Sequence, residues 1–120
     1  ALPASELTMT DLRARFWVDA LRWRAESAGA SIYVAHKGDP DAGVILLKTL
    51  LPERKAQLYA PMRNMEGERV WMMPLGADPV PEQDAESYAR RRIEDDPDLW
   101  LVEVDDPYGR HFLNEAIDKS

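Results

Sequence analysis

The sequence predicts a single α+β domain with a mostly antiparallel sheet of about five strands, an N-terminal helix and a second helix before the last strand. Three observations lead to this prediction: a first segment with helical periodicity, a central run of short strand-like segments, and a second helical segment followed by one more strand. A chain of 120 residues can form one hydrophobic core. The domain is expected over residues 9–120, and residues 1–8 are expected to be an expression remnant or a disordered tail.

The first helix is predicted over residues 11–28. Thr10 is a good N-cap, and Gly29 is placed to end the helix. Apolar residues recur at steps of three and four, which is typical of a helix with one buried face. They are Leu12, Phe16, Trp17, Ala20, Leu21 and Ala28.

The central segment predicts an antiparallel meander. Residues 38–43 have the Gly, Pro and Asp composition of a turn, so the strands on either side are expected to pair as a hairpin. A break at Pro52 and a loop over 61–67 separate the later strands. The four predicted strands span 31–37, 44–50, 55–60 and 69–74, and the second of them is apolar.

A second helix is predicted over residues 82–95, after a proline-rich connector. Ala85, Tyr88, Ala89 and Ile93 form one apolar stripe on it. The strand at 99–104 is apolar on both faces as far as Val102, which favours an inner position in the sheet. Both helices are expected to cover one face of the sheet.

The negative charge lies at the C-terminal end. The net charge of the chain is −7, and residues 93–120 hold nine acids against Arg110 and Lys119. The earlier residues carry equal numbers of both signs. The arginines of the two helices lie beside acids, which favours pairing within the helices over a phosphate-binding track. Nucleic acid is therefore excluded as a partner. The nine acids are Glu94, Asp95, Asp96, Asp98, Glu103, Asp105, Asp106, Glu115 and Asp118.

Composition also limits the compartment and the chemistry. The chain has no cysteine, so disulfides, thiolate metal sites and a thiol nucleophile are excluded. The longest apolar run is too short to cross a bilayer, and no membrane association is expected. A cytoplasmic protein without a cofactor is predicted.

Several sequence blocks resemble a known family. The most specific are Asp96-Pro97-Asp98-Leu99-Trp100 and Gly109-Arg110-His111-Phe112-Leu113. With Phe16-Trp17-Val18, Lys37-Gly38-Asp39, Ala42-Gly43, Lys48 and Leu58-Tyr59, they resemble a bacterial family catalogued as domain of unknown function 1491, over about residues 12–113. The resemblance implies no activity, cofactor or catalytic residue. The chain departs from the family pattern at Pro107, near which a basic residue would be expected.

Complete catalytic motifs are absent from the sequence. Residues 38–43 have the spacing of half a phosphate-binding loop, but Val44 and Ile45 stand where Lys and Ser or Thr are required. His36 and His111 have no second histidine at metal-ligand spacing. The acids between residues 95 and 106 match no EF-hand and suit turns and solvent. No metal site and no catalytic residue are assigned.

Two functional hypotheses follow. The first is a non-enzymatic binding or regulatory module, which presents the acidic C-terminal segment to a basic protein partner or to a second copy of the chain. The second is an enzyme that binds a small molecule or a divalent cation at Glu103, Asp105, Arg110 and His111. Trp23 is a further candidate binding residue, because it lies off the apolar helix stripe between two arginines.

Overall fold

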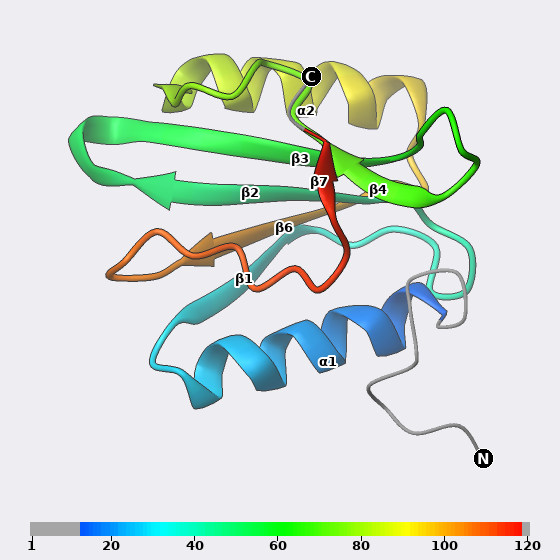
Figure 1. Ribbon diagram of the computed structural model, residues 1–120, viewed down its shortest axis with the longest axis horizontal. Helices are drawn as coiled ribbons and strands as arrows, with labels where there is room; N and C mark the ends of the chain where they lie inside the picture. The colour runs from blue at the N-terminus through cyan, green and yellow to red at the C-terminus, as the bar shows by residue number, and fades with distance from the viewer. Residues whose placement is uncertain (1–12, 119–120) are drawn as a thin grey trace.

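The computed structural model of the chain describes residues 13–118 and contains two helices and seven strands, drawn in Figure 1. A single 3₁₀ turn, Pro52–Arg54, joins the second and third strands. The α+β class is confirmed, but the sheet is mixed and has more than five strands. The elements are α1 (Ala14–Ser27), β1 (Ser31–His36), β2 (Ile45–Leu51), β3 (Lys55–Arg63), β4 (Arg69–Met72), β5 (Val80–Pro81), α2 (Glu82–Asp95), β6 (Trp100–Asp105) and β7 (Ile117–Asp118).

The predicted hairpin between the first two strands is wrong. The strand order is β1-β6-β2-β3-β4-β7, so β6 lies between β1 and β2, and β5 pairs with β3. The inner position predicted for β6 is confirmed: it runs antiparallel to β1 and parallel to β2. The segment before β2 holds the start of β6, because Asp39 N–H donates to Asp98 O and Trp100 Nε1–H donates to Asp39 O. A fully apolar strand gains more burial between two neighbours than at an edge.

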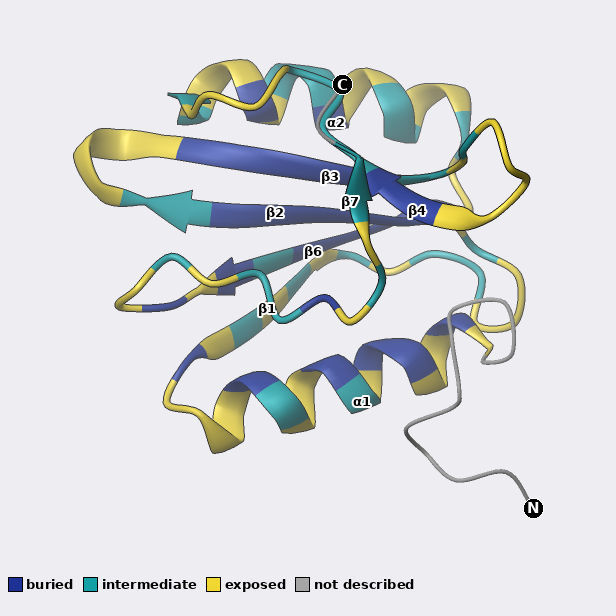
Figure 2. Cartoon of the chain, viewed as in Figure 1, coloured by how far each residue is buried: buried dark blue, intermediate teal, exposed yellow. Residues whose placement is uncertain are grey.

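The two helices cover opposite faces of the sheet, so the prediction that they share one face is wrong (Figure 1). Successive residues of a strand point to opposite faces. Leu47 therefore belongs to the core under α1, with Trp17 and Leu21, whereas Leu46 belongs to the core under α2, with Ala85. Figure 2 shows buried residues along the middle of both β2 and β3, which is the pattern of a sheet covered on two sides.

Three of the four helix limits agree closely with the periodicity, but α1 begins three residues later than predicted. The structure begins α1 at Ala14, with Arg13 extended as the N-cap, and the expected cap Thr10 lies outside the described residues. Gly29 ends the helix as predicted: its φ is +93°, and the N–H groups of Gly29 and Ala30 donate to the carbonyls of Glu26 and Ala25. The limits of α2 are those predicted.

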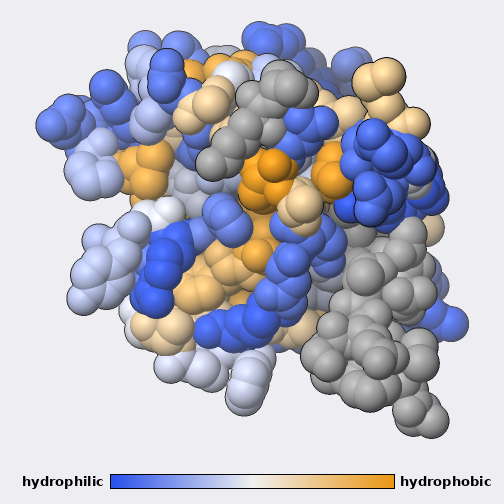
Figure 3. Space-filling model, viewed as in Figure 1, coloured by the Kyte–Doolittle hydropathy of each residue, from blue (hydrophilic) through white to orange (hydrophobic). Residues whose placement is uncertain are grey.

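The β3–β4 hairpin is longer than predicted, because residues 61–63 pair with residues 69–71 instead of forming a loop. After β6 the chain crosses the α1 side of the sheet and leads into β7, an unpredicted strand parallel to β4. This C-terminal segment covers Trp71, whose indole Nε1–H donates to Glu115 at 2.9 Å. In Figure 3, which has α2 at the top and α1 at the bottom, hydrophobic residues lie near the middle of the face toward the viewer and hydrophilic ones surround them. Among residues 13–118, neither helix has the length and apolar character to span a membrane.

Candidate functional site

Lys48 is the one charged residue of β2, an inner strand whose other residues are five apolar side chains and Thr49. Lys48 points to the face that α2 covers, in register with Glu103 of β6 on one side and Leu58 of β3 on the other. Its side chain is 0% exposed. Burial of an ammonium group is costly unless the charge is paired, so the surroundings of Nζ determine whether this position is tolerated.

Three glutamates surround the Lys48 ammonium group. Glu103 Oε2 is 3.1 Å from Nζ, and the Oε1 atoms of Glu82 and Glu86 are each 3.6 Å from it. Glu82 and Glu86 are one turn apart on α2, so both carboxylates reach down to the sheet from the same side of the helix. Here we call these four residues the Lys48 site. One positive charge faces three negative charges, which leaves a net charge of −2.

The ion pairs of the Lys48 site are close but imperfect. Nζ is enclosed, yet no carboxylate oxygen meets it with hydrogen-bond geometry, even at the 3.1 Å separation from Glu103. The carboxylates are also unequal, because the side chain of Glu103 is 21% exposed, that of Glu82 is 37% exposed and that of Glu86 is 52% exposed. Glu103 is therefore the principal counter-ion, and the two helix carboxylates are partly solvated.

Two cavities open on either side of Glu86. One of about 280 Å³, which we call the β6 cavity, lies between α2 and β6 and has the buried Lys48 in its lining. The other, of about 440 Å³, lies at the start of α2 and the turn before β3, and we call it the turn cavity. The β6 cavity is lined by Lys48, Glu86, Ala89, Arg90, Ile93, Glu94, Leu101 and Glu103.

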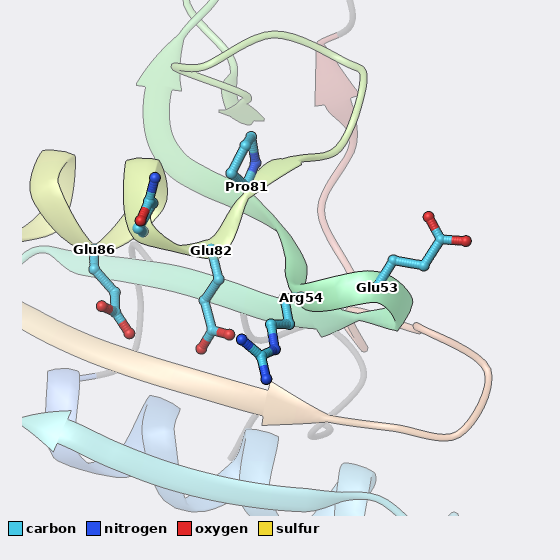
Figure 4. A pocket seen from close by; sticks show the side chains of 6 residues that line it. Glu53, Arg54, Pro81, Glu82 and Glu86 are labelled. Atoms are coloured by element: carbon cyan, nitrogen blue, oxygen red, sulfur yellow. The ribbon is translucent and has the colours of Figure 1, made fainter.

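The turn cavity is lined by Glu53, Arg54, Pro81, Glu82, Gln83 and Glu86. In Figure 4 the side chains of Arg54 and Glu82 point toward one another, and Glu53 points away from them. Glu53 and Arg54 both have positive φ, at 65° and 58°, in the tight turn between β2 and β3. This backbone conformation is uncommon for residues other than glycine, and the turn that contains it places the Arg54 side chain beside Glu82 at the start of α2.

The chemistry available to the Lys48 site is that of a carboxylate-rich surface. It offers acceptors for cationic or hydrogen-bond-donating groups, and Ala89, Ile93 and Leu101 in the adjoining β6 cavity can contact a hydrocarbon chain. Within residues 13–118, no group of three or more His, Cys, Asp or Glu side chains could hold a metal ion.

The four residues of the predicted small-molecule or cation site do not surround one cavity. Glu103 lies under α2 and binds Lys48, and Asp105 is exposed at the end of β6 on the same face. Arg110 and His111 lie on the α1 side, where Arg110 donates to Ala28 O and His111 packs edge-on against Tyr59. The sheet therefore separates the two halves of this predicted site.

Arg110 has a structural role in the turn that follows β6. Its Nε and one terminal nitrogen each donate to the Asp106 carboxylate at 2.8 Å. These bonds, with N–H donation from the backbone of Arg110 and Tyr108, hold the pKa of Asp106 far below its usual range, although desolvation opposes the shift. The charge pair in this turn thus joins Asp106 to Arg110.

His111 supports the path of the C-terminal segment. Its Nδ1 accepts from Leu113 N–H at 2.9 Å, and its ring lies 5.2 Å from that of Tyr59. Burial raises the pKa of the Tyr59 phenol. Arg24 of α1 donates twice to Phe112 O, and its own pKa is lowered by burial, partly offset by the charge of Glu115. These contacts fasten the segment to the α1 side of the sheet.

The acidic C-terminal segment does not present its carboxylates as one surface. Glu103 pairs with Lys48, Asp106 pairs with Arg110, Glu115 accepts from Trp71, and Asp96 accepts from Asp98 N–H. Asp98 and Asp105 are exposed. Part of the charge that the sequence concentrates in this segment is therefore used inside the fold.

Trp23 is 73% exposed on α1, opposite the buried stripe of that helix. Phe16 lies two turns before it and is also exposed. The other tryptophans are buried: Trp17 and Trp100 as predicted from their apolar stripes, and Trp71 under the C-terminal segment. Trp23 therefore remains a candidate binding residue.

Sequence reasoning missed Lys48 as a site residue, although one signal was present. A lysine in the middle of the apolar run 44–50 needs a counter-charge if that strand lies inside the sheet. The sequence could not identify the counter-charge, because β6 and α2 are more than thirty residues away along the chain.

Comparison with known proteins places this fold and sequence in a family. A model of the family described as "Protein of unknown function (DUF1491)" matches residues 12–114. No curated protein is significantly similar to the chain. The structural relatives include a crystal structure of a DUF1491 family protein from Caulobacter crescentus CB15, which is 42% identical, with a TM-score of 0.81 over 89% of this chain and 99% of that one.

Two solution structures extend the comparison. An NMR structure of a DUF1491 family protein from Caulobacter crescentus CB15, also 42% identical, has a TM-score of 0.75 over 89% of this chain and 96% of that one. The protein Atu0922 from A. tumefaciens is 25% identical, with a TM-score of 0.72 over the same shares of the two chains. Because the family model covers most of the chain and the relatives share its fold, this chain belongs to the DUF1491 family of proteins of unknown function.

Proposed function

We propose that this protein is a non-enzymatic binding module that docks a basic segment of a protein partner on the face formed by α2 and the neighbouring strands. One observation carries the proposal: the enclosed Lys48 ammonium group faces three carboxylates, and two cavities open beside them. A structural ion pair needs one counter-ion, and the two further carboxylates add negative charge to an accessible surface.

The charge of this face supports a basic partner. The residues that line the two cavities include five glutamates and three cations, which leaves a net charge of −2. Negative potential over a concave surface attracts cationic groups and raises their association rate. The acids are Glu53, Glu82, Glu86, Glu94 and Glu103, and the cations are Lys48, Arg54 and Arg90.

The α2 face replaces the acidic C-terminal segment as the proposed docking surface. Asp106 and Glu115 of that segment have internal partners, whereas its Glu94 and Glu103, together with Glu53 and Glu86, line the two cavities of the α2 face. The enzyme hypothesis on Glu103, Asp105, Arg110 and His111 has no comparable support, because these residues lie on two sides of the sheet. The cysteine-free composition suits a module that works in the cytoplasm.

The test compares two variants with the same change of charge. Glu53→Gln with Glu94→Gln neutralises two exposed acids that line the cavities of the α2 face, and Asp98→Asn with Asp105→Asn neutralises two exposed acids of the C-terminal segment that line neither cavity. Binding of a fluorescent nona-arginine peptide is measured by anisotropy at low and physiological salt. We expect the first variant to lose most of the affinity and the second to keep it.

Two results would overturn the proposal. Loss of binding in the C-terminal variant alone would move the docking surface to the acidic segment. Equal, weak and fully salt-sensitive binding of all three proteins would mean that only the net charge of the chain attracts the peptide. Sedimentation velocity of the unmodified protein shows whether self-association competes with the peptide.

A further inference from the structure

We infer that the β6 cavity is a recognition site for one arginine side chain of a peptide segment, whose backbone carbonyl bonds to Lys48. The inference rests on the proposed function and identifies the group that the docking surface selects. It begins from the lining of the site: a cavity of about 280 Å³ lined by three apolar side chains, three glutamates, Arg90 and the buried Lys48.

The cavity wall suits a hydrocarbon chain that ends in a cation. Ala89 and Ile93 of α2 and Leu101 of β6 line it with apolar groups, which can contact the three methylene groups of an arginine. Ala89 and Leu101 belong to the core under α2, so this wall is rigid. A small hydrophilic cation, such as a free metal ion, would use none of this apolar surface.

The carboxylate rim suits a guanidinium group. Glu86 and Glu94 approach from α2, and Glu103 approaches from β6, so acceptors are offered from two elements. A guanidinium group has five N–H donors in a fixed plane and is weakly hydrated, and it can bind carboxylates on two sides at once. A lysine ammonium group is compact and strongly hydrated, so it loses more on entering a partly apolar cavity.

The unsatisfied ammonium group of Lys48 is a second observation in favour of a bound peptide, and it does not depend on the number of acids. Lys48 lines the cavity, and its buried Nζ meets no acceptor with hydrogen-bond geometry. An ammonium group has three donors, and a buried donor without an acceptor is costly. Glu86, at 52% exposure, is the most accessible of the carboxylates around Nζ. When the Glu86 carboxylate turns toward the entering guanidinium group, a peptide carbonyl oxygen replaces it beside Lys48 Nζ.

The experiment uses a blocked pentapeptide with a central arginine and the same peptide with citrulline, which is nearly isosteric but uncharged. Each is titrated into the full-length protein, and the methyl resonances of Ala89, Ile93 and Leu101 are followed by NMR. We expect the arginine peptide to shift these methyl groups and the citrulline peptide to bind at least about tenfold more weakly, since charge-assisted hydrogen bonds are the stronger ones. N-ethylguanidinium, which lacks the carbonyl, is expected to bind more weakly than the arginine peptide.

A matched pair of variants tests whether the arginine side chain binds in the β6 cavity. Glu94→Gln removes a rim carboxylate that has no ion pair within 4 Å among residues 13–118. Glu66→Gln removes the same charge from the exposed β3–β4 turn, outside both cavities. We expect Glu94→Gln to weaken the arginine peptide by about tenfold and Glu66→Gln to leave its affinity unchanged.

The outcomes separate this inference from the proposed function. If nona-arginine binds the α2 face but the pentapeptide shifts no cavity methyl group, or if citrulline binds equally well, the arginine site is wrong and the docking surface stands. N-ethylguanidinium affinity equal to that of the peptide would overturn the role of the carbonyl and of Lys48. If neither nona-arginine nor the pentapeptide binds, both proposals fail.

Discussion

Lys48 Nζ and Glu103 Oε2 lie 3.1 Å apart and join the two parallel inner strands, β2 and β6, on the face that α2 covers. The register of the sheet places the two residues side by side, and Glu82 and Glu86 add two further carboxylates from the helix. The same four residues thus fasten α2 to the sheet and give that face its negative charge.

Removal of the Lys48 charge should destabilise the fold. In Lys48→Met, we expect the free energy of unfolding to fall by about 3–5 kcal/mol, because Glu103 is left in a mostly buried position without its counter-ion. Glu103→Gln should cost less, about 1–2 kcal/mol, because Glu82 and Glu86 still neutralise Lys48. Urea denaturation of both variants and of the double variant measures the coupling free energy between Lys48 and Glu103. If each single variant stayed within about 0.5 kcal/mol of the parent, the ion pairs would have no structural role.

Acid should weaken the turn after β6. Hydrogen bonds from the Arg110 side chain, opposed by desolvation and assisted by backbone N–H donors, lower the pKa of Asp106 in the folded state. A carboxyl group with a lowered folded-state pKa stabilises the protein above its unfolded pKa of about 3.9 and loses this contribution as pH falls below that value. The melting temperature should therefore drop between about pH 4 and pH 2. Asp106→Asn should reduce this drop in melting temperature at low pH. If the melting temperature of the variant depended on pH as that of the parent does, other carboxylates would control the drop.

Substitution of Gly38 should disturb the entry of β6. A Cβ atom at Gly38 would overlap the backbone carbonyl of Asp98. The φ of Gly38 is not positive, so the backbone itself would accept alanine and the cost of the substitution is steric. We expect Gly38→Ala to lower the free energy of unfolding by about 2–3 kcal/mol, as overpacking does in a core. Gly67→Ala is the control: its Cβ would meet open space, and only its φ of +82° is unfavourable, at a cost of about 1 kcal/mol. Equal losses in the two variants would mean that the loop moves aside freely.

The exposed and buried tryptophans should respond differently to truncation. Trp71→Ala should cost about 3–5 kcal/mol, because the ring is fully buried. Trp23→Ala should change the free energy of unfolding by no more than about 0.5 kcal/mol, because the side chain is 73% exposed. Chemical denaturation measures both variants. A large loss in Trp23→Ala at low protein concentration would show that Trp23 packs within the fold, and a loss only at high concentration would support its predicted role at an interface.

Features that depend on local patterns could be predicted closely. The limits of α2 and the Gly29 end of α1 follow from periodicity and end signals, and each involves residues within a few positions of one another. The inner position of β6 also followed from local composition, since both of its faces are apolar as far as Val102.

Pairing between distant segments could not be predicted in this way. The turn-like composition of residues 38–43 suggested a hairpin, but β6 enters between β1 and β2 and bonds to that loop through Asp39 and Asp98. A turn signal shows that the chain bends, and it does not show which strand arrives beside it. The order of the sheet therefore came from tertiary packing.

The sequence by itself determined the helices, most of the strands, the concentration of acids near the C-terminus and the resemblance to the DUF1491 family. Only the tertiary structure decided that α1 and α2 cover opposite faces, that Glu103 and Arg110 lie on different sides of the sheet, and that Lys48 meets three glutamates. The physical reason is that periodicity records how each segment buries its own apolar side, whereas a charged site is formed by side chains from segments that meet only when the sheet and helices pack.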